Sequence, residues 1–331
     1  MKTGVSYFGN RMLNHFKDDL KDIKAHNCNF ILHTFSENDY FFYKDTIRDF
    51  VKASHDARLE VYIDPWGVNG IFGGEGDWRW VPQNMDACQI RNDGRHLGIG
   101  CPNNPKLREF LKKWTEVAMA TGADVVFWDE PHFYLANWAG HPKEMWGCCC
   151  EVCKQLFRER FGHDMPKTKD EEVKIFQEAR LFDFLKEMCD NVKAINPEIK
   201  NCICVLPYKD TINSWAKIAS IPTLDIIGTD PYWVGLKENA REFVKYFSEP
   251  IAKCAKDFKK EGQIWVQAFR IPRGTEEDVA TAIDVAYDAG IRNITAWGYS
   301  ACGFMSHLQC GDSEKVWKII GDKYAEKLKA G

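Results

Sequence analysis

The stretch VVFWDEPHFY, residues 125–134, places four apolar residues directly before Asp129 and Glu130. A short apolar run of this kind is typical of a strand that is buried on both faces, as in a parallel sheet. Polar residues that follow such a strand gather at the carboxyl edge of the sheet, where the active sites of (β/α)₈ barrels form. We therefore predict a strand at Asp124–Trp128 and a candidate functional site directly after it.

Outward from this stretch, seven similar runs alternate with amphipathic segments, which indicates parallel strands joined by helices. Helical patterns cover residues 106–120, 179–195 and 276–290, and a last helix is predicted at Glu314–Lys329. The segment GVSYFGNRM after the first run lacks the G-x-G-x-x-G loop of doubly wound sheets, so eight strands favour a closed (β/α)₈ TIM barrel. The seven runs are Thr3–Tyr7, Asn29–Thr34, Leu59–Asp64, Asn201–Leu206, Leu224–Thr229, Gln263–Gln267 and Asn293–Trp297.

The whole chain reads as one domain. Its 331 residues suit a single barrel with insertions, and no repeat, linker or low-complexity tract interrupts them. We predict a single (β/α)₈-barrel domain over residues 1–331. Two connections are long, residues 65–104 after the third strand and residues 131–169 after the fourth, and both leave the carboxyl ends of strands. Long loops at that end usually shape a pocket.

Composition and charge exclude several classes of partner. A net charge of −4 gives no reason to expect a nucleic-acid partner or a charged membrane surface. Neither a signal-like apolar stretch at the N-terminus nor an apolar run of membrane-spanning length is present, so no membrane partner is predicted. Thirteen cysteines in a chain of this size do not indicate a disulfide scaffold. We predict a cytoplasmic protein with reduced thiols.

Carboxyl and aromatic side chains follow most of the predicted strands. Glycoside hydrolysis needs two carboxyl groups across the scissile bond, and aromatic faces can stack on sugar rings. We predict that Glu130 transfers the proton. For the second carboxylate, Asp230 is the first choice and Asp64 or Glu75 the second. The predicted substrate-binding residues are Asp64, Trp66, Glu75, Asp129, His132, Tyr232, Trp233, Gln267, Arg270 and Trp297, with helix capping as the alternative role for Asp129 and Asp230.

Cys148-x-Cys150-x-x-Cys153 brings three thiols into one turn before a predicted helix, which is close to the spacing of metal ligands. A structural zinc site needs a fourth ligand, and Cys101 is the best candidate, with His141 as a weaker one. Cys149 is expected to be a bystander, although it could replace Cys148 or Cys150. We predict structural Zn²⁺ bound by Cys101, Cys148, Cys150 and Cys153.

Residues 101–162 resemble family 42 glycoside hydrolases, the β-galactosidases of clan A. In that family a C-P-x-x-P helix start joins a C-x-C-x-x-C turn to bind structural zinc, and CPNNP at Cys101 and CCCEVC at 148–153 match this arrangement. The family carries its acid/base glutamate at the end of the fourth strand, where Glu130 stands. The resemblance implies a TIM barrel, a carbohydrate substrate and a possible homo-oligomer, with the zinc-site loops as a possible subunit interface.

Two departures from the family limit what the resemblance implies. Asp129 stands where the family has Asn, and Gln267 stands where the clan has its nucleophilic Glu at the end of the seventh strand. β-Galactosidase activity is therefore not implied, and a non-catalytic carbohydrate-binding barrel is the alternative. A barrel enzyme with a catalytic metal is disfavoured, because VSYFGN lacks the H-x-H ligands such sites place after the first strand.

Overall fold

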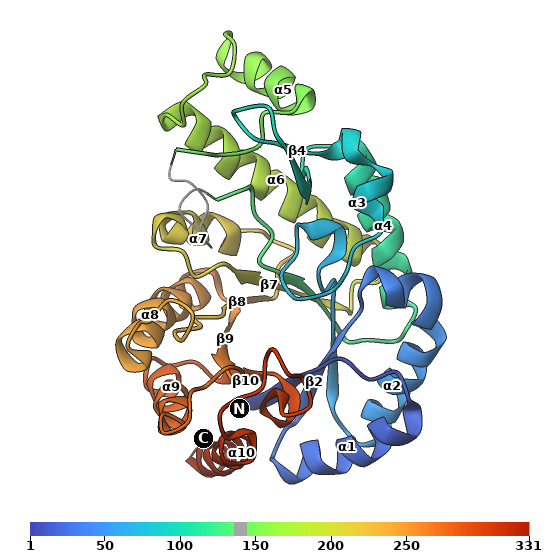
Figure 1. The fold of residues 1–331 in the computed structure, drawn as a ribbon, viewed down its shortest axis with the longest axis vertical. Coiled ribbons are helices and arrows are strands. Elements are labelled where there is room, and N and C mark those ends of the chain that lie inside the picture. The colour runs from blue at the N-terminus through green and yellow to red at the C-terminus, as the bar shows by residue number, and fades with distance from the viewer. Residues whose placement is uncertain (136–143, 331) are drawn as a thin grey trace.

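The computed structural model describes residues 1–135 and 144–330, and there eight parallel strands close into a barrel. Around the barrel their order is β1, β10, β9, β8, β7, β6, β3 and β2, so the first and last strands pair directly. The succession from β7 to β10 can be followed in Figure 1. All eight predicted strands are present, which confirms the (β/α)₈ fold. They are β1 (Lys2–Tyr7), β2 (Phe30–Thr34), β3 (Glu60–Asp64), β6 (Val125–Asp129), β7 (Lys200–Val205), β8 (Ile226–Thr229), β9 (Glu261–Gln267) and β10 (Asn293–Trp297).

Helices surround the barrel and follow the predicted pattern, with one difference. The helix predicted at 179–195 begins at Glu171, because the Asp170 side chain accepts a hydrogen bond of 3.0 Å from the Val173 N–H and caps an earlier start. The main helices are α1 (Leu13–Ala25), α2 (Lys44–Asp56), α4 (Pro105–Met119), α6 (Glu171–Ile195), α7 (Ile212–Ala219), α8 (Ala240–Phe258), α9 (Glu277–Asp288) and α10 (Ser313–Ala330).

The two long loops contain structure of their own. The loop after β3 holds the short helix α3 (Trp80–Gln83) and the antiparallel hairpin of β4 (Cys88–Ile90) and β5 (His96–Gly100), and the loop after β6 holds α5 (Glu151–Phe161). These elements lie together at one end of the molecule (Figure 1). Short helical turns complete the chain: η1 (Asp39–Tyr43), η2 (Val68–Gly70), η3 (Met85–Ala87), η4 (Lys209–Thr211) and η5 (Tyr299–Cys302).

Aromatic side chains fill much of the core. Phe30, Tyr62, Phe127, Trp265 and Trp297 pack inside the barrel, where their strands alternate inward and outward residues. A second layer of apolar residues fills the space between strands and helices. Five of the 12 tryptophans are among the largest fully buried side chains, so much of the aromatic excess serves packing and not sugar binding. Each of the described helices is too short or too polar to cross a lipid bilayer.

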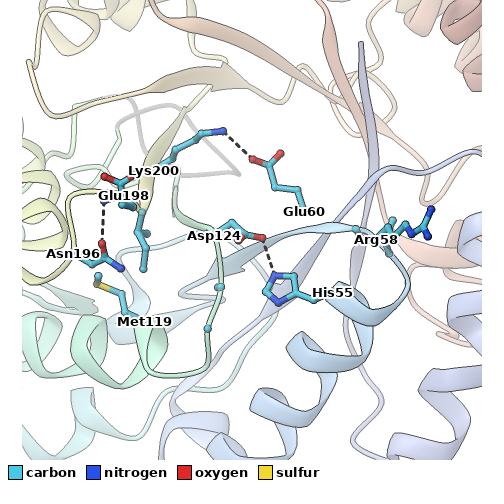
Figure 2. Close-up of a pocket in the computed structure, with 12 residues that line it drawn as sticks. His55, Arg58, Glu60, Met119, Asp124, Asn196, Glu198 and Lys200 are labelled. Atoms are coloured by element: carbon cyan, nitrogen blue, oxygen red, sulfur yellow. Dashed lines mark hydrogen bonds and ion pairs between the residues drawn. The ribbon is translucent and has the colours of Figure 1, made fainter.

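A hollow of about 760 Å³ lies at the amino ends of β3, β6 and β7 (Figure 2). Polar side chains on its wall pair with groups of the protein. His55 Nε2 lies 2.9 Å from Asp124 Oδ2, which also accepts a bond from the Val61 N–H, and Lys200 lies 3.0 Å from Glu60. Residues at the amino-terminal end of a barrel usually contribute to stability and not to catalysis, and these pairs fit that role.

Candidate active site and metal centre

Five acidic residues meet at the carboxyl end of the barrel strands. Asp64 and Asp129 end β3 and β6, Glu130 and Asp230 directly follow β6 and β8, and Glu75 lies in the loop after β3. The charge of Glu75 acts on Asp64, Asp129 and Glu130, so the loop brings it to the strand ends. The structure thus gathers all the carboxyl groups that the sequence predicts for the site.

Glu130 is held in an unusual backbone conformation. Its φ of +45° lies in the left-handed region, which costs a non-glycine residue energy and is often found at functional sites. Backbone hydrogen bonds fix it there: its N–H donates to the Cys204 carbonyl at 3.0 Å, and its carbonyl lies 2.5 Å from Nδ1 of His132. Burial raises the pKa of the Glu130 carboxyl to about 7.

Asp230 contacts Glu130 directly. Their carboxyl groups share a hydrogen bond, and burial together with the charge of Glu130 raises the pKa of Asp230 well above its usual range. The Cys204 thiol donates to Asp230 at 3.6 Å. Two carboxyls that flank a glycosidic bond stand roughly 5 Å or more apart. The structure therefore places Asp230, the first choice for the second carboxylate, closer to Glu130 than two carboxyls that flank a glycosidic bond.

Asp64 and Asp129 form the floor of the acid cluster. Asp64 is fully enclosed, and neither of its carboxylate oxygens has a hydrogen-bond partner among the described residues. Burial raises the pKa of both carboxyls well above their usual range, and the proximity of Asp129 raises that of Asp64 further. As it stands Asp64 is out of reach of a bound molecule, whereas Asp129 retains a small exposed surface.

The glycine-rich loop after β3 lies against this cluster. A Cβ atom on Gly73 would stand 2.5 Å from Asp129 Oδ2 and 3.2 Å from Glu130 Oε2, so those two oxygens are no more than about 6 Å apart. A Cβ on Gly74 would overlap the Trp66 ring. The Gly73 N–H also donates to the Asp129 carbonyl at 3.0 Å. Only residues without side chains can approach the strand ends so closely.

A buried glutamate fixes the same loop from behind. Glu37, fully buried after β2, accepts hydrogen bonds from the backbone N–H groups of Asn69, Arg79 and Trp80, at 2.9, 2.5 and 2.7 Å. These bonds tie both arms of the loop to β2. The loop that carries Glu75 is therefore a defined wall of the site.

Aromatic rings form a further wall of the site, and one of them, Trp66, belongs to the same loop. The ring centroids of Trp66 and Trp297 lie 5.5 and 5.3 Å from that of Phe8, and Trp66 is half-buried. Tyr232 packs edge-on against Phe269 at 5.0 Å. Trp233, predicted as a substrate contact, lies instead in the core layer between strands and helices, because successive residues of an extended chain point to opposite sides.

The predicted polar contacts after β9 are engaged with the protein backbone. Gln267 accepts a hydrogen bond from the Val234 N–H at 3.1 Å and donates to the Phe269 carbonyl at 3.0 Å, so its amide joins the loops after β8 and β9. Arg270 is exposed, and its Nε donates to the His307 carbonyl at 3.0 Å. Arg270 and His307 interact electrostatically with Glu75, so all three residues lie around the mouth of the barrel.

His132, two residues after Glu130, lines a second cavity. This cavity has a volume of about 680 Å³ and opens between α6, α7 and the end of β7. Pro131, His132 and Cys204 line the part nearest to Glu130. The site thus adjoins open space on the side of β6 and β7.

Four buried cysteines form a separate cluster that can hold a metal ion. The sulfur atoms of Cys101, Cys148, Cys150 and Cys153 all lie within 4.8 Å of one another, and two of the pairs are 3.5 and 3.7 Å apart. Four thiolates 2.3 Å from a tetrahedral ion would be separated by about 3.8 Å, so the donor set fits. Among the residues that the structure describes, no other group of His, Cys, Asp and Glu meets this geometry.

Polar groups around the cysteines suit thiolate ligands. The Ile90 and Cys150 N–H groups point to Cys148 Sγ at 3.4 Å, and the Asn103 amide donates to Cys153 Sγ at 3.2 Å. Arg180 in turn fixes Asn103 at 2.8 Å. Such bonds orient ligands and stabilise their charge. The predicted bystander Cys149 is not in the cluster, all thirteen cysteines have free thiols, and His141 lies outside the described residues.

Sequence reasoning missed three contributors to the active-site region. Phe8 directly follows β1, and its place after a predicted strand was an available signal. No signal in the sequence marks Gly73 or His307, because their importance depends on which loops cross the mouth of the barrel. Long-range contacts of this kind are visible only in the folded chain.

No protein-family model and no curated protein matches this chain. Solved structures do share its fold. A polyextremophilic β-galactosidase from the Antarctic haloarchaeon Halorubrum lacusprofundi superposes with a TM-score of 0.73 at 12% identity, over 98% of this chain and 58% of that one. A β-galactosidase from the psychrophilic Marinomonas ef1 gives 0.73 at 10% identity, over 99% and 60%.

A shorter enzyme is similar as well. The endo-1,4-β-mannanase of Rhizomucor miehei gives a TM-score of 0.66 at 11% identity and is covered over 95% of its length. At these identities the likeness shows the fold alone, and this chain spans about three fifths of the two β-galactosidases. The predicted resemblance to the β-galactosidases is confirmed for the barrel fold.

Proposed function

We propose that this protein is a glycoside hydrolase in which Glu130 protonates the leaving oxygen of an O-glycosidic bond. The observation that carries the proposal is the Glu130 carboxyl, held at the mouth of a closed barrel among other carboxyls and beside an aromatic wall. The glycosidases of the same fold support a carbohydrate substrate. Both features together favour hydrolysis over simple binding.

The environment of Glu130 suits a general acid. Such a residue must hold its proton at working pH and release it in the transition state, which a pKa near 7 allows. Asp230 donates a hydrogen bond to the Glu130 carboxylate that remains after proton transfer. The half-buried rings of Trp66 and Tyr232 can stack on a sugar, and Asp129, His132, Arg270 and Trp297 complete the proposed surroundings of the substrate.

The test is a screen of purified protein against aryl glycosides and oligosaccharides, beginning with β-galactosides and β-mannosides because enzymes of those names share the fold. Hydrolysis by the wild type that Glu130→Gln lowers by about 10²–10⁴-fold supports the proposal. Equal turnover by the Gln variant removes Glu130 from the mechanism. Glu198→Gln, exposed on the loop before β7 at the amino end of the barrel, is the matched control.

A non-catalytic carbohydrate-binding barrel is the second candidate. Gln267 favours it, because an amide bonded to the Val234 and Phe269 backbone stands where the clan has a carboxylate. Calorimetric binding of a sugar without turnover of any glycoside in the screen would select this function over hydrolysis.

We further propose that the ion held by Cys101, Cys148, Cys150 and Cys153 is structural zinc. Four sulfur ligands leave no open coordination position, which is typical of a structural site and not of a catalytic one. The four cysteines come from the two long loops, so the ion would cross-link the loop after β3 to the loop after β6.

A further inference from the structure

The second carboxyl group of the proposed hydrolase is the open question of this site. Gln267 supplies none, Asp230 is bonded to Glu130, and Asp64 is fully enclosed. Asp129 precedes Glu130 on the same strand, and its oxygen Oδ2 lies against Gly73. Of the five acids only Glu75 is both exposed and carried by a different element from Glu130.

The loop geometry places Glu75 within reach of the reacting bond. Gly73 contacts the Glu130 and Asp129 carboxylates, and Gly74 contacts the Trp66 ring. Consecutive Cα atoms are 3.8 Å apart, so Glu75 begins at most ~7.6 Å from Gly73. The Glu75 carboxyl interacts electrostatically with Glu130 on one hand and with Arg270 and His307 on the other, which places it at the mouth of the barrel.

We propose that Glu75 is the second catalytic carboxylate and acts as the general base of an inverting hydrolysis, an inference that rests on the proposed function. Glu75 takes a proton from a water molecule, whose oxygen bonds to the anomeric carbon. The bond from that carbon to the leaving oxygen breaks, and Glu130 gives its proton to the leaving oxygen. A sugar and an alcohol leave, and the proton on Glu75 returns to Glu130 through solvent.

The exposure of Glu75 favours a role as general base over a role as nucleophile. A nucleophile stands close enough to bond to the anomeric carbon, whereas a base stands farther back on the same face of the sugar and leaves room for a water molecule. Glu75 is the most water-accessible of the five acids, on a loop fixed by Glu37 and not on a strand. Burial of its carboxyl raises the pKa of Glu75 and so makes it a better base, while Trp66 and Arg270 favour the ionised form.

The test combines product stereochemistry with chemical rescue. With a glycoside that the wild type cleaves, proton NMR of the first product should show the inverted anomer. Glu75→Ala should lose at least ~10²-fold in kcat, and added azide, which needs no base, should restore turnover with a glycosyl azide as product. Asp77→Asn, an exposed acid on the same loop, should retain wild-type rates, and thermal melts should show both variants folded.

The remaining outcomes distinguish a failure of the proposed role of Glu75 from a failure of the proposed hydrolase. Retention of configuration, a Glu75→Ala variant within tenfold of wild type, or a folded variant that azide does not rescue overturns the role of Glu75 while Glu130-dependent hydrolysis stands. A wild type that cleaves no glycoside overturns the proposed hydrolase and the role of Glu75 with it.

Discussion

At the scale of single residues, Glu130 and Asp230 are joined by a hydrogen bond between their carboxyl groups. Asp230 donates a hydrogen bond that lowers the pKa of Glu130, against the burial that raises it to about 7. The proposed acid works when protonated, so hydrolysis should fall as pH rises through about 7. A kcat/KM profile from pH 5 to 9 measures this basic limb, and a rate that instead rises through pH 7 contradicts an acid role for Glu130.

Two substitutions of Asp230 separate a positioning residue from a reacting one. Asp230→Ala removes the hydrogen bond that lowers the pKa of Glu130, so the basic limb should move to higher pH with a moderate loss of kcat. Asp230→Asn keeps a hydrogen-bond donor to Glu130, so the basic limb of its pH profile should stay near that of the wild type. If Asp230 were the nucleophile, both variants would lose about as much activity as Glu130→Gln.

At the scale of elements, the loop after β3 sets the shape of the proposed site. Ala at Gly73 would press a methyl carbon 2.5 Å from Asp129 Oδ2 and 3.2 Å from Glu130 Oε2. Gly73→Ala should therefore lower kcat/KM at least tenfold, because the Asp129 and Glu130 carboxylates must move to make room for the methyl group. Gly235→Ala, which meets nothing within 4 Å, is the control.

The metal cluster joins the two long loops, so its loss should destabilise both. Cys101→Ser should reduce bound zinc, measured by mass spectrometry of the metal, and lower the melting temperature by at least ~5 °C. Cys149→Ser should retain about one ion per chain, since Cys149 lies outside the cluster. Retention of the ion in the Cys101 variant, or its loss in the Cys149 variant, contradicts the ligand assignment.

How far the sequence predicts these elements depends on the range of the contacts. The eight strands and the cysteine set follow from local patterns, namely apolar runs and ligand spacing, and both are present in the structure. Trp233 was misplaced because a shift of one residue in an extended segment turns the side chain to the other side. The contact between Asp230 and Glu130 joins β8 to β6 and leaves no trace in either segment.

At the scale of the whole molecule, the acid cluster couples stability to pH. Burial raises the pKa of Glu130 to about 7 and those of Asp64, Asp129 and Asp230 well above their usual range. An acid whose pKa is higher in the folded than in the unfolded chain stabilises the fold while it is protonated. This stabilisation is complete at pH values below the pKa of the acid in the unfolded chain, near 4. It is lost as the pH rises through the pKa of the acid in the folded chain.

The free energy of unfolding should therefore fall between pH 6 and 8. Glu130 alone should account for about 1 kcal/mol of the loss, because the folded chain gives up roughly one proton there that the unfolded chain has already released. Urea unfolding with zinc present throughout measures the change, since metal release at low pH would act in the opposite direction. Glu130→Gln should flatten the dependence by about that amount. A wild type equally stable at both pH values would mean that the carboxyls at the barrel mouth are ionised in the fold, and with it that Glu130 holds no proton to give.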